Sequence, residues 1–451
     1  MPAAENPHPT PVTWSQALRF WFRLGCISFG GPAGQIAIMH RELVEQKRWI
    51  SERRFLHALN FCMLLPGPEA QQLATYLGWL MHRTWGGVAA GLLFVLPSLL
   101  LLLGLSWAYL AFGTAPWLTA VLWGVKPAVA ALVLQAVVRI GSRTLHTPRR
   151  APLLWAIALL SFVAVALLQV PFPAVVLAAA LTGVVARRFW PDQFANGGAH
   201  GPASSKQKLD STQFWIGDDT PTPAHARFKK IRLVGVFAAG AALWLVPLVV
   251  LMAVWGWDGT LTRMAWFFTK AALLTFGGAY AVLPYVYQGA VDQFGWLSAA
   301  QMMDGLALGE TTPGPLIMVV SFVGFVGGWS QAVLGSENLL WGATLSAVVV
   351  TWFTFLPSFI FILAGGPFIE STHGQLQFTA PLTAVTAAVV GVIASLGIFF
   401  VLRIAYPGGP TAGLDMAALV LALAAAFALM RRGWAVVPVI AACAAIGWAW
   451  H

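Results

Sequence analysis

The chain has 451 residues, of which 59% are hydrophobic and only 9% are charged. Soluble domains carry about 25% charged residues, so this composition excludes an ordinary soluble protein. It predicts an all-α polytopic membrane protein, with the lipid bilayer as its surroundings. The formal net charge of +10 is attributed to basic cytoplasmic loops, and nucleic acid is not expected as a partner.

Cysteine usage argues against bound metals. Cys26, Cys62 and Cys443 form no Cys-x-x-Cys pair and no Cys/His cluster, so no metal site and no cofactor are expected. Residues 1–13 hold no Lys or Arg, which argues against a cleavable signal peptide. The apolar segments themselves are then expected to direct insertion into the membrane.

The first predicted repeat covers residues 14–145. It contains Phe29-Gly30-Gly31, a basic stretch at 40–54, and Pro66-Gly67-Pro68 inside an apolar segment. Pro removes an amide donor and Gly weakens a helix, so Pro-Gly-Pro should break the helix there. In hydrocarbon, the freed polar backbone groups must meet protein, water or a ligand.

The second half repeats these features. Residues 146–261 are predicted to hold connecting helices around a polar cytoplasmic loop at 189–231. The second repeat covers 262–405, and 406–451 forms a helical hairpin. At a shift of 247 residues, eleven of the forty positions from Phe29 to Pro68 are identical, including Phe276-Gly277-Gly278 and Pro313-Gly314-Pro315. Leu96-Pro97-Ser98 recurs as Leu356-Pro357-Ser358 at a shift of 260. This ordered set indicates an internal duplication.

The charges of two equivalent loops predict that the repeats are inverted. The stretch at 40–54 holds five Lys and Arg residues, whereas its counterpart at 287–301 holds none. Cytoplasmic loops collect Lys and Arg, so the two loops should lie on opposite sides of the membrane, as in many secondary transporters. If the broken segments are re-entrant, 22 of the 26 Lys and Arg residues fall in the cytoplasm. The expected architecture is about nine full spans plus four broken segments.

An anion site is predicted where the breaks meet. Helix N-termini carry partial positive charge, Pro suits the first helical turn, and buried cations in membranes are usually functional. The expected substrate-binding residues are Arg23, Gly30, Gly31, Pro66, Gly67, Pro68, Gln71, Lys126, Lys270, Gly277, Gly278, Thr311, Thr312, Pro313, Gly314 and Pro315. Glu69 and Glu310 are the expected proton carriers, because intramembrane carboxylates commonly relay protons.

Each of these residues also has a structural interpretation. The paired glycines would allow close helix packing, and Glu69 would cap a half-helix. Arg23, Lys270 and Lys126 would extend to the lipid headgroups. Gln71 would hold neighbouring helices together. The two Pro-Gly-Pro breaks are the hardest to explain structurally, because they occupy equivalent places.

At these residues the sequence resembles the chromate ion transporter family in its long, two-domain form. The resemblance rests on four stretches: FGGPAGQIAIMHRELVEQKRWIS, LLPGPEAQQLATYLGW, LTFGGAYAVLPYV and TTPGPLIMVVSFVGF. The resemblance implies a transporter of the bacterial inner membrane that exports chromate and confers chromate resistance. Leu316 stands where the equivalent of Glu69 is expected, so the two halves should contribute unequally to the site.

Two other functions remain open from the sequence. Sulfate resembles chromate in shape and charge, so the protein could instead import or exchange sulfate or a related oxyanion. An intramembrane enzyme or scaffold is disfavoured, because the chain holds no HExxH or GxSxG motif. No P-loop motif is present either, which argues against ATP-driven transport. The coupling ion is undetermined, and a homodimer is one of the oligomeric states left open.

Overall fold

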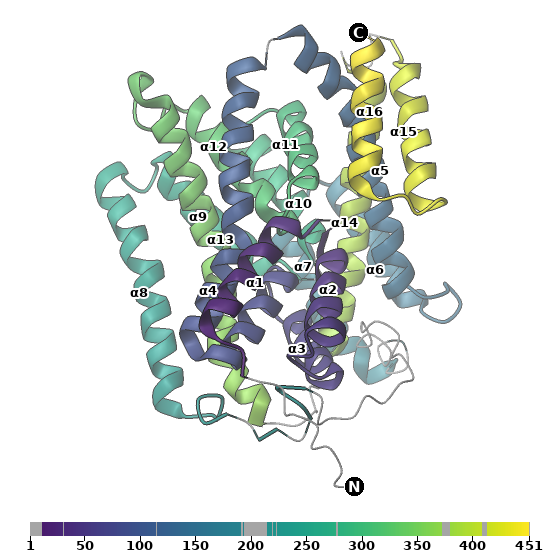
Figure 1. Cartoon of the computed structure of the whole chain (residues 1–451). Helices are drawn as coiled ribbons and strands as arrows, with labels where there is room; N and C mark the ends of the chain where they lie inside the picture. The colour runs from purple at the N-terminus through teal and green to yellow at the C-terminus, as the bar shows by residue number, and fades with distance from the viewer. Residues whose placement is uncertain are drawn as a thin grey trace, which may run out of the picture.

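Helices make up almost all of the described chain, shown in Figure 1 as a computed structural model. The structure describes residues 11–29, 31–113, 115–190, 193, 214–218, 220–221, 223–276, 278–371, 379–407 and 413–450. Within these residues the only extended pairing is an isolated bridge between Ile50 and Ile216. The all-α class predicted from composition is therefore confirmed.

The first half begins with short helices separated by breaks. Thr13 caps α1 with a reciprocal capping box, and Ser51 caps α3. The long helix α4 changes direction at His82 and Arg83, where the φ of Arg83 is +59°. The elements are α1 (Trp14–Ile27), α2 (Gly31–His40), η1 (Arg41–Gln46), α3 (Glu52–Leu64) and α4 (Glu69–Phe112).

The second half follows the same succession. A π-helical turn again follows the second helix, and Ser298 again caps the third. Figure 1 shows α2 and α3 below the middle of the bundle and α10 and α11 above it. The elements are α9 (Thr260–Leu274), α10 (Ala279–Tyr287), η4 (Gln288–Gln293), α11 (Ala299–Thr311), η5 (Leu316–Met318), α12 (Val319–Ser330), η6 (Ser336–Asn338) and α13 (Leu339–Ser371).

The remaining helices exchange partners between the halves. The long helices α5 and α14 pack against each other; α14 also contacts α6 and α7, while α5 contacts α15 and α16. The hairpin that follows each half thus packs on the long helix of the other half: α6 and α7 pack on α14, and α15 and α16 pack on α5. The elements are α5 (Pro116–Thr144), α6 (Pro152–Ala166), α7 (Phe172–Phe189), α8 (Lys230–Trp255), α14 (Thr379–Ala405), α15 (Met416–Met430) and α16 (Val436–Trp450).

Six of the described helices are long and apolar enough to cross a bilayer: α4, α5, α7, α8, the stretch containing η6 and α13, and α14. The connector α8 lies at the left edge of Figure 1, and only 11% of its most apolar window is buried, as expected of a lipid-facing helix. The polytopic class follows from these helices. The count of nine full spans and the four-part division of the chain stay predictions. Most of the predicted polar loop at 189–231 lies outside the described residues.

Candidate functional site

Reciprocal backbone hydrogen bonds join the helix breaks of the two halves. The amide of Gly67 donates to the carbonyl of Thr275 over 2.7 Å, and the amide of Gly314 donates to the carbonyl of Ser28 over 2.8 Å. Ser28 and Thr275 occupy equivalent positions, as do the two glycines, at the shift of 247. Amides freed by Pro-Gly-Pro therefore bond to the backbone of the opposite half, which satisfies them inside a helical bundle.

The central glycine of each break has a backbone conformation that other residues rarely adopt. The φ of Gly67 is +128° and that of Gly314 is +103°. A Cβ at Gly67 would collide with the hydroxyl of Ser358, and one at Gly314 would lie 2.7 Å from the Cβ of Ser98. Both serines belong to the repeated Leu-Pro-Ser motif. Ser98 of the first half packs on the break at Gly314, and Ser358 of the second half packs on the break at Gly67. The sequence shows the repeated motif, but not this exchange between halves.

Polar atoms gather beside Gly314. The side-chain amide of Gln35 donates to the carbonyls of Gly314 and Ser28. The hydroxyls of Ser28 and Ser98 and the Oε1 atom of Gln35 are buried and have no hydrogen-bond partner among the described residues. Unsatisfied buried polar atoms are rare in native proteins and call for an explanation. Two free hydroxyl donors beside the starts of α2 and η5 suit a small bound anion.

Two glutamates and an arginine lie near the same breaks. Glu310 is buried at the end of α11 and accepts a hydrogen bond from the hydroxyl of Tyr280. Glu69 is the half-buried first residue of α4. The cations whose charge favours ionised Glu69 are Arg143 first and then Arg139, which is half-buried on α5, and the charge of Arg139 also favours ionised Glu310. Sequence reasoning missed Arg139, because its position suggests one of the cytoplasmic cations that follow this helix.

Lys126 forms an ion pair with a residue that the sequence did not single out. Its Nζ atom lies 3.6 Å from the Oδ1 atom of Asp304, whose side chain is 3% exposed. The hydroxyl of Tyr109 donates to Oδ2 of the same carboxylate over 3.0 Å. This upper cluster (Tyr109, Lys126 and Asp304) joins α4 and α5 of the first half to α11 of the second.

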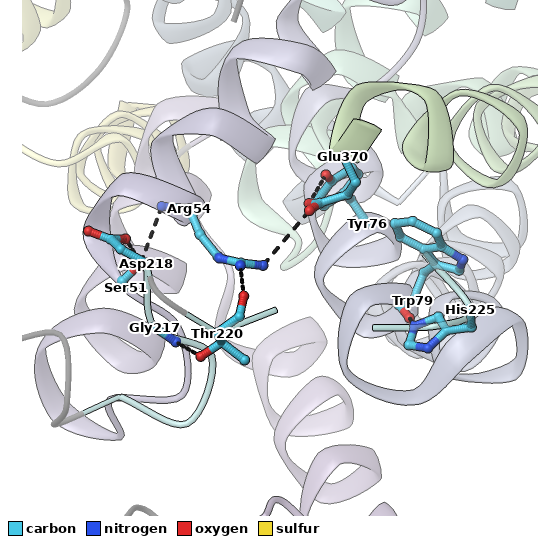
Figure 2. A network of polar contacts seen from close by, with 9 residues as sticks. All are labelled: Ser51, Arg54, Tyr76, Trp79, Gly217, Asp218, Thr220, His225 and Glu370. Carbon is cyan, nitrogen blue, oxygen red and sulfur yellow. Dashed lines mark hydrogen bonds and ion pairs between the residues drawn. The ribbon is translucent and has the colours of Figure 1, made fainter. Parts of the chain in front are cut away.

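A second cluster joins the halves at the opposite end of the bundle. The hydroxyl of Tyr76 donates to Oε1 of Glu370 over 2.6 Å, and Nη1 of Arg54 lies 3.8 Å from Oε2 (Figure 2). This lower cluster (Arg54, Tyr76 and Glu370) links α3 and α4 to α13. Arg54 also donates to the carbonyl of Thr220, so the described part of the connecting loop lies against it.

The same loop segment is attached at two further points shown in Figure 2. The hydroxyl of Ser51 donates to Oδ1 of Asp218 over 2.5 Å. The Nε2 atom of His225 lies 3.0 Å from the carbonyl oxygen of Trp79. The described loop residues Asp218, Thr220 and His225 therefore bond to α3, α4 and the cap of α3.

Two predicted cations lie away from the breaks. Arg23 and Lys270 are exposed on the outer faces of α1 and α9, and the Nζ atom of Lys270 lies 6.0 Å from the ring centroid of Trp266. Their burial among the breaks does not occur, because α1 packs on α4 through the side that carries Ala17, Trp21 and Leu24. This placement agrees with the structural interpretation of the two cations.

The other predicted residues lie at or beside the breaks, in differing roles. Thr311 and Thr312 donate their hydroxyl protons to carbonyls of α11, and Gln71 donates to the hydroxyl of Thr75. Gly31 begins α2 with a φ of +70°, and Gly278 precedes α10 with a φ of +98°. The flanking prolines Pro66, Pro68, Pro313 and Pro315 lie in the two breaks, whereas Gly30 and Gly277 fall outside the described residues.

Fold and site together define a polytopic membrane protein whose broken helices cross at its centre. A family model described as "Chromate transporter" matches residues 15–184 and 262–448. The chain belongs to the chromate transporter family.

Curated relatives match over most of their length. The chain is 34% identical over 390 residues to a chromate transport protein of Pseudomonas aeruginosa, covering 85% of this chain and 80% of the relative. It is 31% identical over 395 residues to a chromate transport protein of Cupriavidus metallidurans, covering 87% and 84%. It is 29% identical over 387 residues to a probable chromate transport protein of Synechococcus elongatus, covering 86% and 84%. No solved structure matches the chain.

Proposed function

We propose that the protein is a secondary transporter that exports chromate from the cytoplasm across the bacterial inner membrane, and so confers chromate resistance. The observation that carries this proposal is the crossing of the two Pro-Gly-Pro breaks. At this crossing the amides of Gly67 and Gly314 bond to the opposite half, beside the buried and unpaired hydroxyls of Ser28 and Ser98. Membership of the chromate transporter family and the names of the relatives support chromate as the anion.

The chemistry of this site suits a tetrahedral dianion. Ser28 and Ser98 would donate hydroxyl hydrogen bonds, and the starts of α2 and α4 would offer free amides. Arg139 would supply the balancing positive charge with a planar pair of donors. Donors fixed in the protein replace the hydration of the anion without reorganising, which lowers the cost of moving it through a medium of low dielectric.

The halves are proposed to form an inverted repeat with re-entrant broken segments. Three features support this: the same order of elements, the placement of α2 and α3 opposite α10 and α11, and the exchanged hairpins. The lower and upper clusters would then close the two ends of one pathway. Opening them in turn would give alternating access to the central site.

Cysteine labelling tests the inversion. In a variant lacking Cys26, Cys62 and Cys443, single cysteines replace Glu45 in η1 or Asp292 in η4. We expect a membrane-impermeant maleimide added from the periplasm to label position 292 but not position 45, since equivalent turns should face opposite sides. Permeabilised cells serve as the control in which both positions react. Equal labelling of the two positions in intact cells would contradict the inversion.

Glu69 and Glu310 are proposed to couple chromate export to proton movement. Arg139 acts on both carboxylates, so a change of charge on either glutamate alters the potential at the anion site. The chromate dianion and a carboxylate would compete for the same arginine. Protonation of a glutamate would therefore favour binding of chromate, so a proton would move together with the anion.

Chromate flux into everted vesicles tests the function and the role of Arg139. We expect saturable uptake by the intact protein, and a loss of about tenfold or more in Arg139→Gln, because hydrogen bonds to charged groups are worth about 1.5–3 kcal/mol. Exposed Arg149, which lies just beyond α5, provides the matched control Arg149→Gln, which should transport normally.

A growth assay separates export from sulfate import. An exporter protects cells from chromate, whereas an importer of sulfate-like anions makes them more sensitive. Absence of saturable chromate flux in the intact protein, combined with increased sensitivity, would replace the export proposal with the import alternative.

A further inference from the structure

A basic pocket lies on the outer side of the first half, away from the helix breaks. Its volume is about 390 Å³, and its lining residues are Val12, Gln16, Arg19, Phe20, Arg23, Lys47 and Trp49. The lining includes three cations and no carboxylate. Buried or clustered cations without acids repel one another unless an anion lies between them.

The pocket follows from the sequence of α1 and the turn that faces it. Gln16, Arg19, Phe20 and Arg23 are spaced i, i+3, i+4 and i+7, so they form one stripe on the helix. Lys47 follows η1, and its Nζ atom lies 5.9 Å from the ring centroid of Phe20 and 5.6 Å from that of Trp49. Aromatic rings thus hold the ammonium group in place at the rim.

The equivalent place on the second half is built differently. At the shift of 247, Trp266 replaces Arg19 and Phe294 replaces Lys47. The cations at this place are Lys270, in the position of Arg23, and Arg263, which is paired with Asp258. Phe294 stacks on Trp296 with ring centroids 4.6 Å apart, so aromatic rings occupy the space in which Lys47 stands in the first half. The set of Arg19, Arg23 and Lys47 is therefore not repeated in the second half, and it lies on one side of the membrane under the proposed inversion.

We propose that this pocket binds the phosphate headgroup of an anionic phospholipid from the cytoplasmic leaflet. The large apolar side chains of Trp14 and Phe22 are 43% and 51% exposed on the same helix, which places acyl chains beside the cations. Anionic lipids attract basic segments next to the membrane, and basic pockets at helices bind lipid headgroups. Arg23, expected from the sequence to bind the transported anion, is assigned to this lipid.

Native mass spectrometry of the purified full chain tests the proposal. The probes are phosphatidylglycerol and phosphatidylcholine of equal chain length. The pocket variant is Arg19→Gln/Arg23→Gln/Lys47→Gln, and the matched control is Arg41→Gln/Arg53→Gln/Arg188→Gln, which removes the same charge from exposed positions elsewhere. We expect the wild type and the control to bind phosphatidylglycerol in preference, and the pocket variant to bind it at least tenfold more weakly.

Three outcomes would overturn the proposal: equal loss in both triple variants, unchanged binding in the pocket variant, or displacement of the lipid by millimolar inorganic phosphate or chromate. The last outcome would make the pocket a site for free oxyanions. The single variant Lys47→Met provides a test that does not depend on folding of the triple variant. It should weaken phosphatidylglycerol binding at least threefold while chromate flux persists.

Discussion

Replacing Gly314 with alanine should abolish chromate flux, and Gly67→Ala should do the same. At both positions φ lies in the positive region, +103° and +128°, where an L side chain is strained by about 1–3 kcal/mol. The added methyl group at Gly314 would also lie 2.7 Å from the Cβ of Ser98. The break would have to move, and with it the amide that bonds the carbonyl of Ser28. Flux in everted vesicles, normalised to inserted protein, measures the loss.

Two kinds of companion variant make this prediction specific. Gly104→Ala and Gly235→Ala place a methyl group in open space within helices, so they should keep full flux and slightly raise stability. Gly314→Ala/Ser98→Gly removes the steric collision but leaves the backbone strain, and should restore stability in part without restoring flux. Wild-type flux in Gly314→Ala would show that the crossing is not the transport site.

The positions of the breaks could be predicted from the sequence, because Pro-Gly-Pro interrupts a helix locally, whatever its neighbours are. The partners of the freed amides could not. The amide of Gly67 donates to the carbonyl of Thr275, more than two hundred residues away. No local sequence pattern predicts whether protein, water or a ligand accepts a hydrogen bond from such an amide.

The cations show what sequence patterns settle and what they leave open. Arg23 shares a stripe with Gln16 and Arg19, about a third of a turn away from the buried stripe of Ala17, Trp21 and Leu24. Helical spacing alone could therefore have placed Arg23 on the outer face. Arg139 offers no such signal, because its role depends on how α5 lies against two breaks from different halves.

The role of Asp304 could not be predicted from the sequence either. Asp304 lies midway along α11, at the position equivalent to His57, so the repeat offers no matching acid. Its importance becomes visible only when α5 brings Lys126 within 3.6 Å. A buried carboxylate paired with a cation from the opposite half is the contact that the proposed alternating access would have to break.

The upper cluster predicts an unequal pair of single variants. Lys126→Met should destabilise the protein by about 3 kcal/mol or more, because it leaves a buried carboxylate whose remaining partner is the hydroxyl of Tyr109. Asp304→Asn should cost less, about 1 kcal/mol, because the side chain of Lys126 is 31% exposed and can be hydrated. Thermal unfolding in detergent measures both changes.

The double variant Lys126→Met/Asp304→Leu separates stability from transport. Replacing a buried ion pair with apolar residues of similar volume is often neutral or stabilising, so its unfolding temperature should return to near the wild-type value. Flux should stay at least tenfold low, because an apolar contact would hold the upper end closed, whereas the proposed alternation needs an ion pair that can separate and be hydrated. If the double variant transports at the wild-type rate, the pair serves stability alone, and the closing of the pathway at that end must reside in other contacts between α4 and α12.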